Sequence, residues 1–340
     1  MKTTAIAFRW CFAGEAMTGK QLFLILALML WPVWASGGGE DGAGRLAILN
    51  SNTVVDQAGR KIVVRAPFRR VISLYGAHTE NLFSLGLADE IIGVSPHEDF
   101  PPRAASKPVF SYHDDPEKFI AARPDLVLIR PMIDRGYPKF VSMLEKTGAT
   151  VVSLQPASIE EMYTYWEILG ILTASRDQAG SLIGRFRSAV SDFKNSAARR
   201  LDKKRVYFEA IHSKMKTFTP DSMAIFALEA AGGINIAADA EAVRNTNIAY
   251  YGKERILSHA AEIDVFLAQY GAMNRPTVSM IKNEPGFQVI KAVRGDQIYI
   301  IEEQLVSRPT MRLLAGIDRI GRILYPNAFE AKAADIFRAE

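Results

Sequence analysis

The chain has 340 residues, 49% of them hydrophobic, and a formal net charge of only +4 at pH 7. This length allows two domains of ordinary size, each with its own hydrophobic core. The small basic excess is spread along the chain, with one dense patch at residues 199–205, and no nucleic-acid-binding motif accompanies it, so the composition argues against a nucleic-acid partner.

The N-terminus carries the pattern of an export signal. Lys20 precedes an apolar run, residues 22–31, and the chain turns small and polar after Ala35. The run is too short to span a bilayer comfortably. We therefore predict a signal peptide, residues 1–35, that is cleaved after Ala35.

The cysteine count restricts the chemistry of the exported chain. Cys11 is the single cysteine and lies before the predicted cleavage point. The mature chain would contain no disulfide, thiolate metal site, cysteine nucleophile or lipid-modified cysteine. We expect a soluble periplasmic protein; translation from Met17 instead of Met1 would give a signal peptide of more usual length.

The next segments predict a leader and an α/β lobe. Residues 36–50 are expected to be a flexible leader, and their G-x-G-x-x-G pattern has no preceding strand, so it is not a dinucleotide site. A hairpin follows, and then short apolar strands alternate with helices. Such alternation predicts a parallel sheet covered on both faces, in an N-terminal lobe of residues 51–170. The expected hairpin strands are 53–56 and 61–64, the later strands 71–75, 91–94, 126–129 and 150–154, and the helices 79–85, 116–122 and 137–147.

A long helix is predicted between two such lobes. Capping boxes begin at Ser158 and Ser175, and apolar residues then keep helical spacing to about Leu201. We predict a stiff spine helix within residues 171–203, a C-terminal α/β lobe at 204–326 and a tail at 327–340. The second lobe is expected to hold strands 205–211, 265–269 and 297–301 and helices 222–231 and 311–324. The predicted fold is therefore two Rossmann-like lobes with mainly parallel sheets, joined by one rigid helix, with a cleft between them.

Two glutamates occupy matching places in the two halves. Glu80 and Glu254 each lie just inside a predicted helix that follows a strand and a short loop. Exposed acids, one on each lobe, would orient a two-lobed carrier on a basic partner. Taken singly, each could instead be an ordinary acid at a helix start, where it favours the helix dipole.

Several stretches, in order, resemble a known family. They include Val55-Asp56 with Gly59-Arg60, Arg70 to Leu74, Thr79-Glu80 with Leu85-Gly86-Leu87, Ile92-Gly93-Val94, Glu117, Arg123 to Val127, Glu254, and Ser307-Arg308-Pro309 with Arg312. Over residues 50–326 the chain resembles the substrate-binding proteins of ABC importers for iron complexes and cobalamin, the class with a helical spine. Where that family usually has Ser-Pro, this chain has Tyr75-Gly76.

The resemblance implies a function without catalysis or a resident cofactor. It implies a periplasmic monomer that captures a metal chelate, namely a ferric siderophore, haem or cobalamin, and delivers it to an ABC importer permease in the inner membrane. In that family a glutamate on each lobe pairs with permease arginines, and Glu80 and Glu254 fall at those positions.

Candidate ligand residues follow from the sheet geometry. In open parallel sheets, ligands bind beyond the carboxyl ends of the strands. Aromatic faces there suit a large planar ligand, and arginines suit its carboxylates. Arg308 is the strongest single candidate, and its alternative role is an ion pair with Glu302 or Glu303. The residues predicted to face a ligand are Tyr75, Tyr112, His113, Arg130, His212, Tyr270 and Arg308.

Two alternatives stay open from the sequence. A zinc or manganese carrier of the same architecture would need His97, His113 and His212 to converge with Asp99. An exported α/β hydrolase-type enzyme would need a nucleophile elbow, a metalloprotease helix or a phosphate loop, and the chain has none of these motifs. The tyrosines favour an iron complex slightly over cobalamin.

Overall fold

The computed structural model describes residues 44–198, 202–243 and 246–326, which belong to one compact unit. The predicted signal peptide, its cleavage point and the tail at 327–340 lie outside these residues. Within the described ranges, none of the helices combines the length and the apolar character that crossing a membrane requires.

A small antiparallel sheet opens the described chain. Strand β2 (Thr53–Val55) pairs with β3 (Lys61–Val63), which confirms the predicted hairpin, and also with β1 (Ala47–Asn50). The expectation of a flexible leader is therefore wrong for its last residues. The cause is that Leu46 is buried in the same core as Val54 and Ile62, so the segment gains apolar contacts that its sequence alone does not reveal.

The N-terminal lobe is built on a four-stranded sheet. Its strand order is β5-β4-β6-β7 and every neighbouring pair is parallel, as predicted. All four residues of β6 are buried, which is the pattern of a strand covered on both faces. The strands are β4 (Val71–Ser73), β5 (Ile91–Val94), β6 (Leu126–Ile129) and β7 (Thr150–Ser153), and the helices are α2 (Gly76–Ser84), η1 (Pro102–Ser106), α3 (Pro116–Ala122), α4 (Pro131–Gly136) and α5 (Pro138–Lys146).

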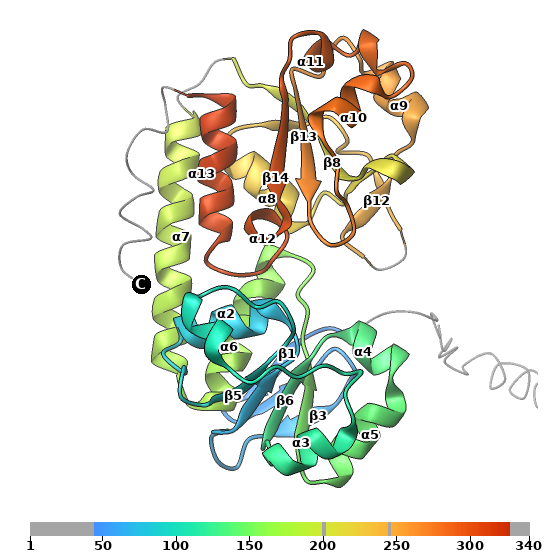
Figure 1. Ribbon diagram of the computed structural model, residues 1–340. Coiled ribbons are helices and arrows are strands. Elements are labelled where there is room, and N and C mark those ends of the chain that lie inside the picture. Colours follow the sequence, from blue (N-terminus) through green and yellow to red (C-terminus); the bar gives the residue numbers. More distant parts are fainter. Residues whose placement is uncertain (1–43, 199–201, 244–245, 327–340) are drawn as a thin grey trace, which may run out of the picture. The chain divides into compact units, whose positions relative to one another are not determined.

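Two helices connect the N-terminal sheet to the second one. Helix α6 (Ile159–Thr173) begins at the predicted cap, where the Ser158 hydroxyl accepts a hydrogen bond from the Glu161 amide. Helix α7 (Arg176–Ala198) has 23 residues, or about 35 Å at 1.5 Å per residue. The Ser175 hydroxyl lies 2.7 Å from that of Thr173 and bonds it. Figure 1 shows α7 running beside the terminal helix α13 (Leu313–Leu324), and the two are packed together.

The C-terminal sheet has seven strands. Its main path is β11-β12-β9-β8-β13-β14, with β10 pairing with the start of β8. The strands are β8 (Arg205–Ile211), β9 (Lys216–Phe218), β10 (Ile234–Asn235), β11 (Glu241–Ala242), β12 (Ile248–Tyr250), β13 (Val265–Tyr270) and β14 (Ile298–Glu302). The remaining helices are η2 (His212–Lys214), α8 (Met223–Ala230), α9 (Lys253–Ser258), α10 (Val278–Asn283), η3 (Phe287–Val289), α11 (Lys291–Arg294) and α12 (Glu303–Val306).

The two sheets share one topology. Strands β10-β8-β13-β14 are mutually parallel and repeat the order β5-β4-β6-β7 of the first lobe. By chain order, α8 corresponds to α2, because each follows the first of the four strands in its lobe. Helix α9 corresponds to α3, because each precedes the third of these strands, β13 or β6. The antiparallel strands β9, β12 and β11 are an addition to the second lobe.

The carboxyl ends of the two sheets are brought together by a short segment between α12 and α13. The Pro309 carbonyl of this segment accepts hydrogen bonds from Asn81 Nδ2 at 2.9 Å and from Trp166 Nε1 at 3.2 Å. Asn81 lies on α2 and Trp166 on α6, so the connection beyond β14 is anchored in the first lobe.

Candidate functional site

Tyr75 and Arg130 form a stacked pair at the carboxyl ends of β4 and β6. Each residue directly precedes the helix that follows its strand. The Arg130 guanidinium carbon lies 4.7 Å from the centre of the Tyr75 ring. Burial raises the pKa of Tyr75 to about 12, although Arg130 and Arg308 act in the opposite direction. Tyr75 therefore remains a neutral phenol at physiological pH.

Arg308 is committed to partners within the protein. Its Nη1 lies 2.9 Å from Glu80 and 3.5 Å from Glu98. The alternative pairing with Glu302 or Glu303 is wrong. Burial alone would lower the pKa of Arg308, but Glu98 and Glu80 raise it above its ordinary value, so the guanidinium is charged. Two acids already neutralise Arg308, and its contact with a ligand stays a prediction.

Glu80 is buried, with 3% of its surface exposed. Its carboxylate accepts from Arg312 Nη2 at 2.5 Å and Nε at 2.8 Å, in addition to the bond from Arg308. The expectation that Glu80 is an exposed docking acid is wrong. The first turn of α2 lies under the segment that follows α12, and the sequence could not reveal that this segment covers it.

Glu98 completes this cross-lobe group. Its carboxylate accepts a hydrogen bond from Ser95 at 2.6 Å, and burial raises its pKa. A Cβ atom on Gly76 would overlap the side chains of Arg308 and Glu98, so only glycine leaves room for their contact. We call Glu80, Glu98, Arg308 and Arg312 the cross-lobe ion cluster; its two acids and two arginines balance in charge when all are ionised.

Three aromatic rings lie together after β5 and after α4. The ring of Tyr112 is 4.3 Å from that of His113 and 4.7 Å from that of Tyr137, between ring centres. His113 is exposed, whereas the two tyrosines are partly buried. The sequence interpretation overlooked Tyr137 because it placed this residue inside a helix; in the structure it precedes Pro138, the first residue of α5.

In the second lobe, His212 is largely enclosed. Its Nδ1 lies 3.0 Å from the fully buried Glu209, and its Nε2 lies 3.8 Å from Glu284. The hydrogen bond with Glu209 raises the pKa of His212, and burial raises the pKa of Glu209. Both ring nitrogens face carboxylates of the same lobe, and the contact of His212 with a ligand stays a prediction.

Tyr270 remains available at the end of β13. It is 46% exposed, and Met273 in the following loop is 64% exposed. The same loop is tied to the carboxyl end of β14, because the Ala272 amide donates to Glu303 at 3.1 Å. Tyr270 therefore agrees in position and exposure with the sequence prediction, and its contact with a ligand stays a prediction.

The histidines proposed for a bare metal ion do not converge. His97 and His113 are exposed, while His212 is engaged with Glu209. Across the described ranges, no group of three or more histidine, cysteine, aspartate or glutamate side chains is placed to hold a metal ion. The zinc or manganese alternative thus has no supporting geometry in this part of the chain.

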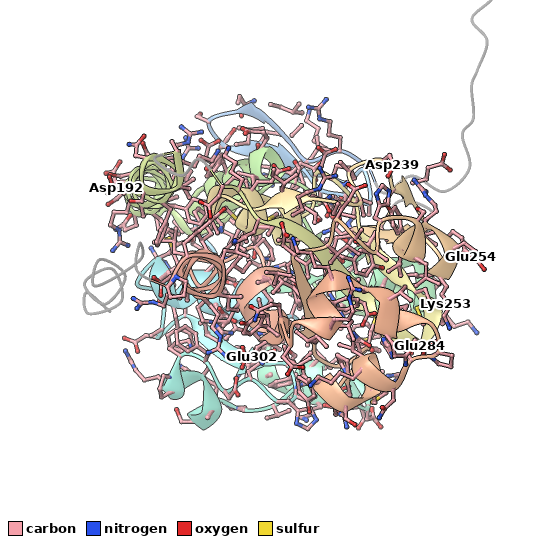
Figure 2. The ribbon with its side chains drawn as sticks, turned by 90° about the horizontal axis from the view of Figure 1, so that it is seen from above. Asp192, Asp239, Lys253, Glu254, Glu284 and Glu302 are labelled. Carbon is pink, nitrogen blue, oxygen red and sulfur yellow. The ribbon has the colours of Figure 1, made fainter. Side chains whose placement is uncertain are left out.

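Two exposed acids occupy equivalent helices of the two lobes. Glu254 is the second residue of α9 and points outward beside Lys253 and Glu284 in Figure 2. Helix α3 is the counterpart of α9 in the first lobe, and its second residue is the exposed Glu117. The sequence contained this signal, because Glu117 precedes the strand at 126–129 much as Glu254 precedes that at 265–269.

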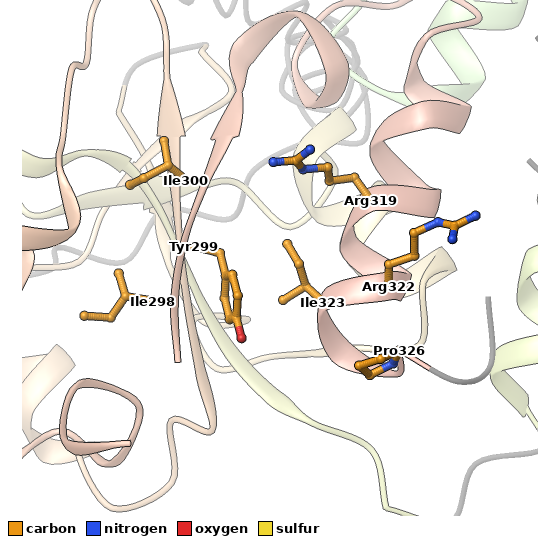
Figure 3. Close-up of a pocket in the computed structure, with 7 residues that line it drawn as sticks. All are labelled: Ile298, Tyr299, Ile300, Arg319, Arg322, Ile323 and Pro326. Atoms are coloured by element: carbon orange, nitrogen blue, oxygen red, sulfur yellow. The ribbon is translucent and has the colours of Figure 1, made fainter. Parts of the chain in front are cut away.

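A hollow of about 440 Å³ lies elsewhere, between β14 and α13 (Figure 3). Ile298, Tyr299 and Ile300 line it from the strand, and Arg319 and Ile323 from the helix. These strand residues belong to the amino-terminal part of β14. The hollow is therefore separate from the carboxyl-end residues described above.

The chain matches a known protein family and is similar to two bacterial proteins. Residues 71–305 match a family described as "Periplasmic binding protein". The chain is 23% identical over 283 residues to an uncharacterised ABC transporter substrate-binding lipoprotein of Bacillus subtilis, covering 82% of this chain and 87% of that protein. It is 23% identical to a vitamin B12-binding protein of Vibrio cholerae, with 75% and 88% covered.

A solved structure is also similar. It is a possible iron-binding, periplasmic solute-binding protein from Staphylococcus epidermidis, with 28% identity and a TM-score of 0.67. The match covers 76% of this chain and all of that one.

Proposed function

Because the chain belongs to the periplasmic binding protein family, we propose that it captures a metal chelate in the periplasm and delivers it to the permease of an ABC importer. Similar proteins include a vitamin B12-binding protein and a possible iron-binding protein. The proposal is a binding function without catalysis, which agrees with the family.

The observation that carries this proposal is the meeting of two sets of strand ends. Tyr75 and Arg130 stand at the ends of β4 and β6, and the exposed Tyr270 stands at the end of β13. Arg308, which follows β14 and α12, bonds to Glu80 on α2, so the two sets are held facing each other. Aromatic and cationic groups at such ends suit a large, partly planar ligand with acidic substituents.

The proposal includes little opening between the lobes. Most buried residues of α6 and α7 belong to one hydrophobic core that also includes residues of both sheets. The cross-lobe ion cluster adds charge-assisted hydrogen bonds between the lobes. A lobe rotation would have to break these contacts, so we propose that the ligand enters a largely preformed site.

We further propose that Glu117 and Glu254 are the docking acids. Both are exposed and occupy the second position of equivalent helices, whereas Glu80 is buried and paired. Charge pairs at a rim govern orientation and on-rate, so their reversal should slow docking without changing ligand affinity.

Two measurements test the function. The mature chain is titrated with haem, ferric citrate, a ferric hydroxamate and cyanocobalamin while its intrinsic fluorescence is followed. If it binds none of the four, the proposal is overturned. Stimulation of the cognate importer in proteoliposomes is then measured for Glu117→Lys and Glu254→Lys. Asp192→Lys, on the exposed face of α7, is the matched control. Equal stimulation by all three variants would exclude the docking assignment.

A further inference from the structure

Arg130 carries a charge that no carboxylate neutralises within the described ranges. The guanidinium stacks on Tyr75, and its Nη2 lies 3.2 Å from the sulfur of Met132. Its Nε is buried and has no hydrogen-bond acceptor among the residues that the structure describes. An unpaired guanidinium with a buried donor is costly, unless a ligand supplies the missing acceptor.

Arg308 and Arg312, which lie near the same strand ends, do not require an acceptor from a ligand. Arg308 is neutralised by Glu80 and Glu98, and Arg312 by Glu80. Arg312 also lies over the ring of Phe100, with its guanidinium carbon 4.3 Å from the ring centre. Arg130 is therefore the cation that remains for a ligand among these three.

The nearby acid of the second lobe restricts where a negative group could lie. Glu303 is close enough to Tyr75 to raise its pKa, and its Oε2 accepts from the Ala272 amide. A carboxylate at this position repels an anion from the side of β14. The two charges together favour a ligand whose acidic end points toward β6 and whose neutral or aromatic body extends toward Tyr270.

We propose that Arg130 binds a carboxylate of the transported chelate, so that the chain selects acidic metal chelates over neutral ones. This inference rests on the proposed function and specifies its ligand class. The guanidinium offers a planar fork that matches a carboxylate, and its buried Nε would gain the acceptor it lacks. The carboxylate could belong to a porphyrin or to a carboxylate siderophore, and the test separates these sources.

The test compares Arg130→Gln with Arg135→Gln. Arg135 is an exposed arginine of α4, the helix that Arg130 directly precedes, and it makes no ion pair within the described ranges. Both variants and the parent are first compared by thermal unfolding, and then titrated with haem, ferric citrate, metal-free citrate and cyanocobalamin at two salt concentrations.

The parent is expected to bind haem or ferric citrate more tightly than cyanocobalamin. For Arg130→Gln, the Kd of the acidic chelate should rise about 10- to 100-fold, which corresponds to the loss of one charge-assisted bond. The Kd should also rise with salt in the parent and less so in this variant. Arg135→Gln should match the parent, and Arg130→Lys should recover part of the affinity, because it keeps the charge but loses the fork.

The outcomes are distinguishable. Tightest binding of cyanocobalamin, or equal Kd values for parent and Arg130→Gln, overturns the inference and leaves the proposed function intact. Arg130-dependent binding of metal-free citrate, with no chelate bound more tightly, supports the carboxylate site and contradicts the proposed function. If the parent binds none of these probes, both the inference and the proposed function are overturned. A comparison of the Kd values of haem and ferric citrate then identifies whether a porphyrin carboxylate or a siderophore-type carboxylate is recognised.

Discussion

The two lobes share a four-strand topology but neutralise their buried acids in different ways. In the first lobe, Glu80 is paired with Arg308 and Arg312, which come from the far end of the chain. In the second lobe, Glu209 is paired with His212, three residues away. The first acid depends on the other lobe, and the second does not. The buried charge of Glu80 is therefore tolerable because Arg308 and Arg312, from the segment that follows α12, neutralise it.

The largest expected effect is the loss of Glu80. Glu80→Ala leaves two partly buried arginines with one acid, Glu98, between them, and removal of one partner from a buried ion pair typically costs about 3–5 kcal/mol. We expect a loss of unfolding free energy of this size in urea titrations.

Glu254→Ala is the matched control for this prediction. The sequence placed Glu254 at a position matching that of Glu80, but Glu254 is exposed, so we expect no measurable change in stability. Similar losses in both variants would mean that the cross-lobe ion cluster does not stabilise the fold.

A smaller, pH-dependent effect is expected in the second lobe. The pKa of His212 is raised in the folded state, so its stabilisation is complete below its unfolded value of about 6.5 and disappears as pH rises through the folded value. The raised pKa of Glu209 acts in the same direction, because its charged form is disfavoured by burial. Glu209→Gln should therefore cost about 1.5–3 kcal/mol at pH 6 and less at pH 9.

The measurement is the difference in unfolding free energy between Glu209→Gln and the parent at pH 6, 7.5 and 9. Glu262→Gln is the control, since Glu262 faces the partly exposed His259 at 3.7 Å and should show little change with pH. A gap for Glu209→Gln that widens toward pH 9 would contradict the assigned charge pair.

A steric effect is expected where the second lobe supports the connecting segment. A Cβ on Gly316 of α13 would overlap the backbone carbonyl of Leu305 on α12, and backbone cannot move aside as a flexible side chain can. Gly316→Ala should destabilise the protein by about 1–3 kcal/mol. Because α12 leads directly to Arg308, we also expect faster amide exchange in the 307–312 segment of this variant. Unchanged exchange there would mean that the packing of α12 does not affect the cross-lobe ion cluster.

The smallest effect should have the opposite sign. Gly184 lies on the exposed side of α7, and a Cβ there would meet no atom within 4 Å. Gly184→Ala should stabilise the chain by about 0.5–1 kcal/mol, since alanine loses less backbone entropy in a helix. A fall in the thermal unfolding midpoint would contradict the assignment of Gly184 to an exposed position in a regular α7 helix.

Much of the fold was predictable because it depends on local pattern. The buried strand at 126–129, the hairpin turn before Lys61 and the cap at Ser158 are each specified by residues close together in the sequence. The parallel pairing of the strands in the N-terminal sheet follows from their alternation with helices, whereas their order in the sheet was not predicted. The same patterns placed Tyr75, Arg130 and Tyr270 at strand ends.

The failures concern residues whose partners are far away in the chain. Glu80 and Glu254 look alike locally, yet one contacts residues 228 and 232 positions later and the other is exposed. The correct counterpart of Glu254 is Glu117, which becomes evident only when α3 and α9 are matched through the two sheets. The sequence likewise favoured Arg308 over Arg130 as a ligand contact, because it could not show that Glu80 and Glu98 pair with Arg308.

The sequence by itself determined the two α/β lobes, the long helix between them and the kinds of side chain at the strand ends, because these depend on periodicity and on short-range capping. Only the tertiary structure decided which charges are already neutralised and which remain for a ligand or a permease. The physical reason is that the cost of a buried charge depends on whatever lies within a few ångströms of it, and those neighbours come from segments that the sequence keeps far apart.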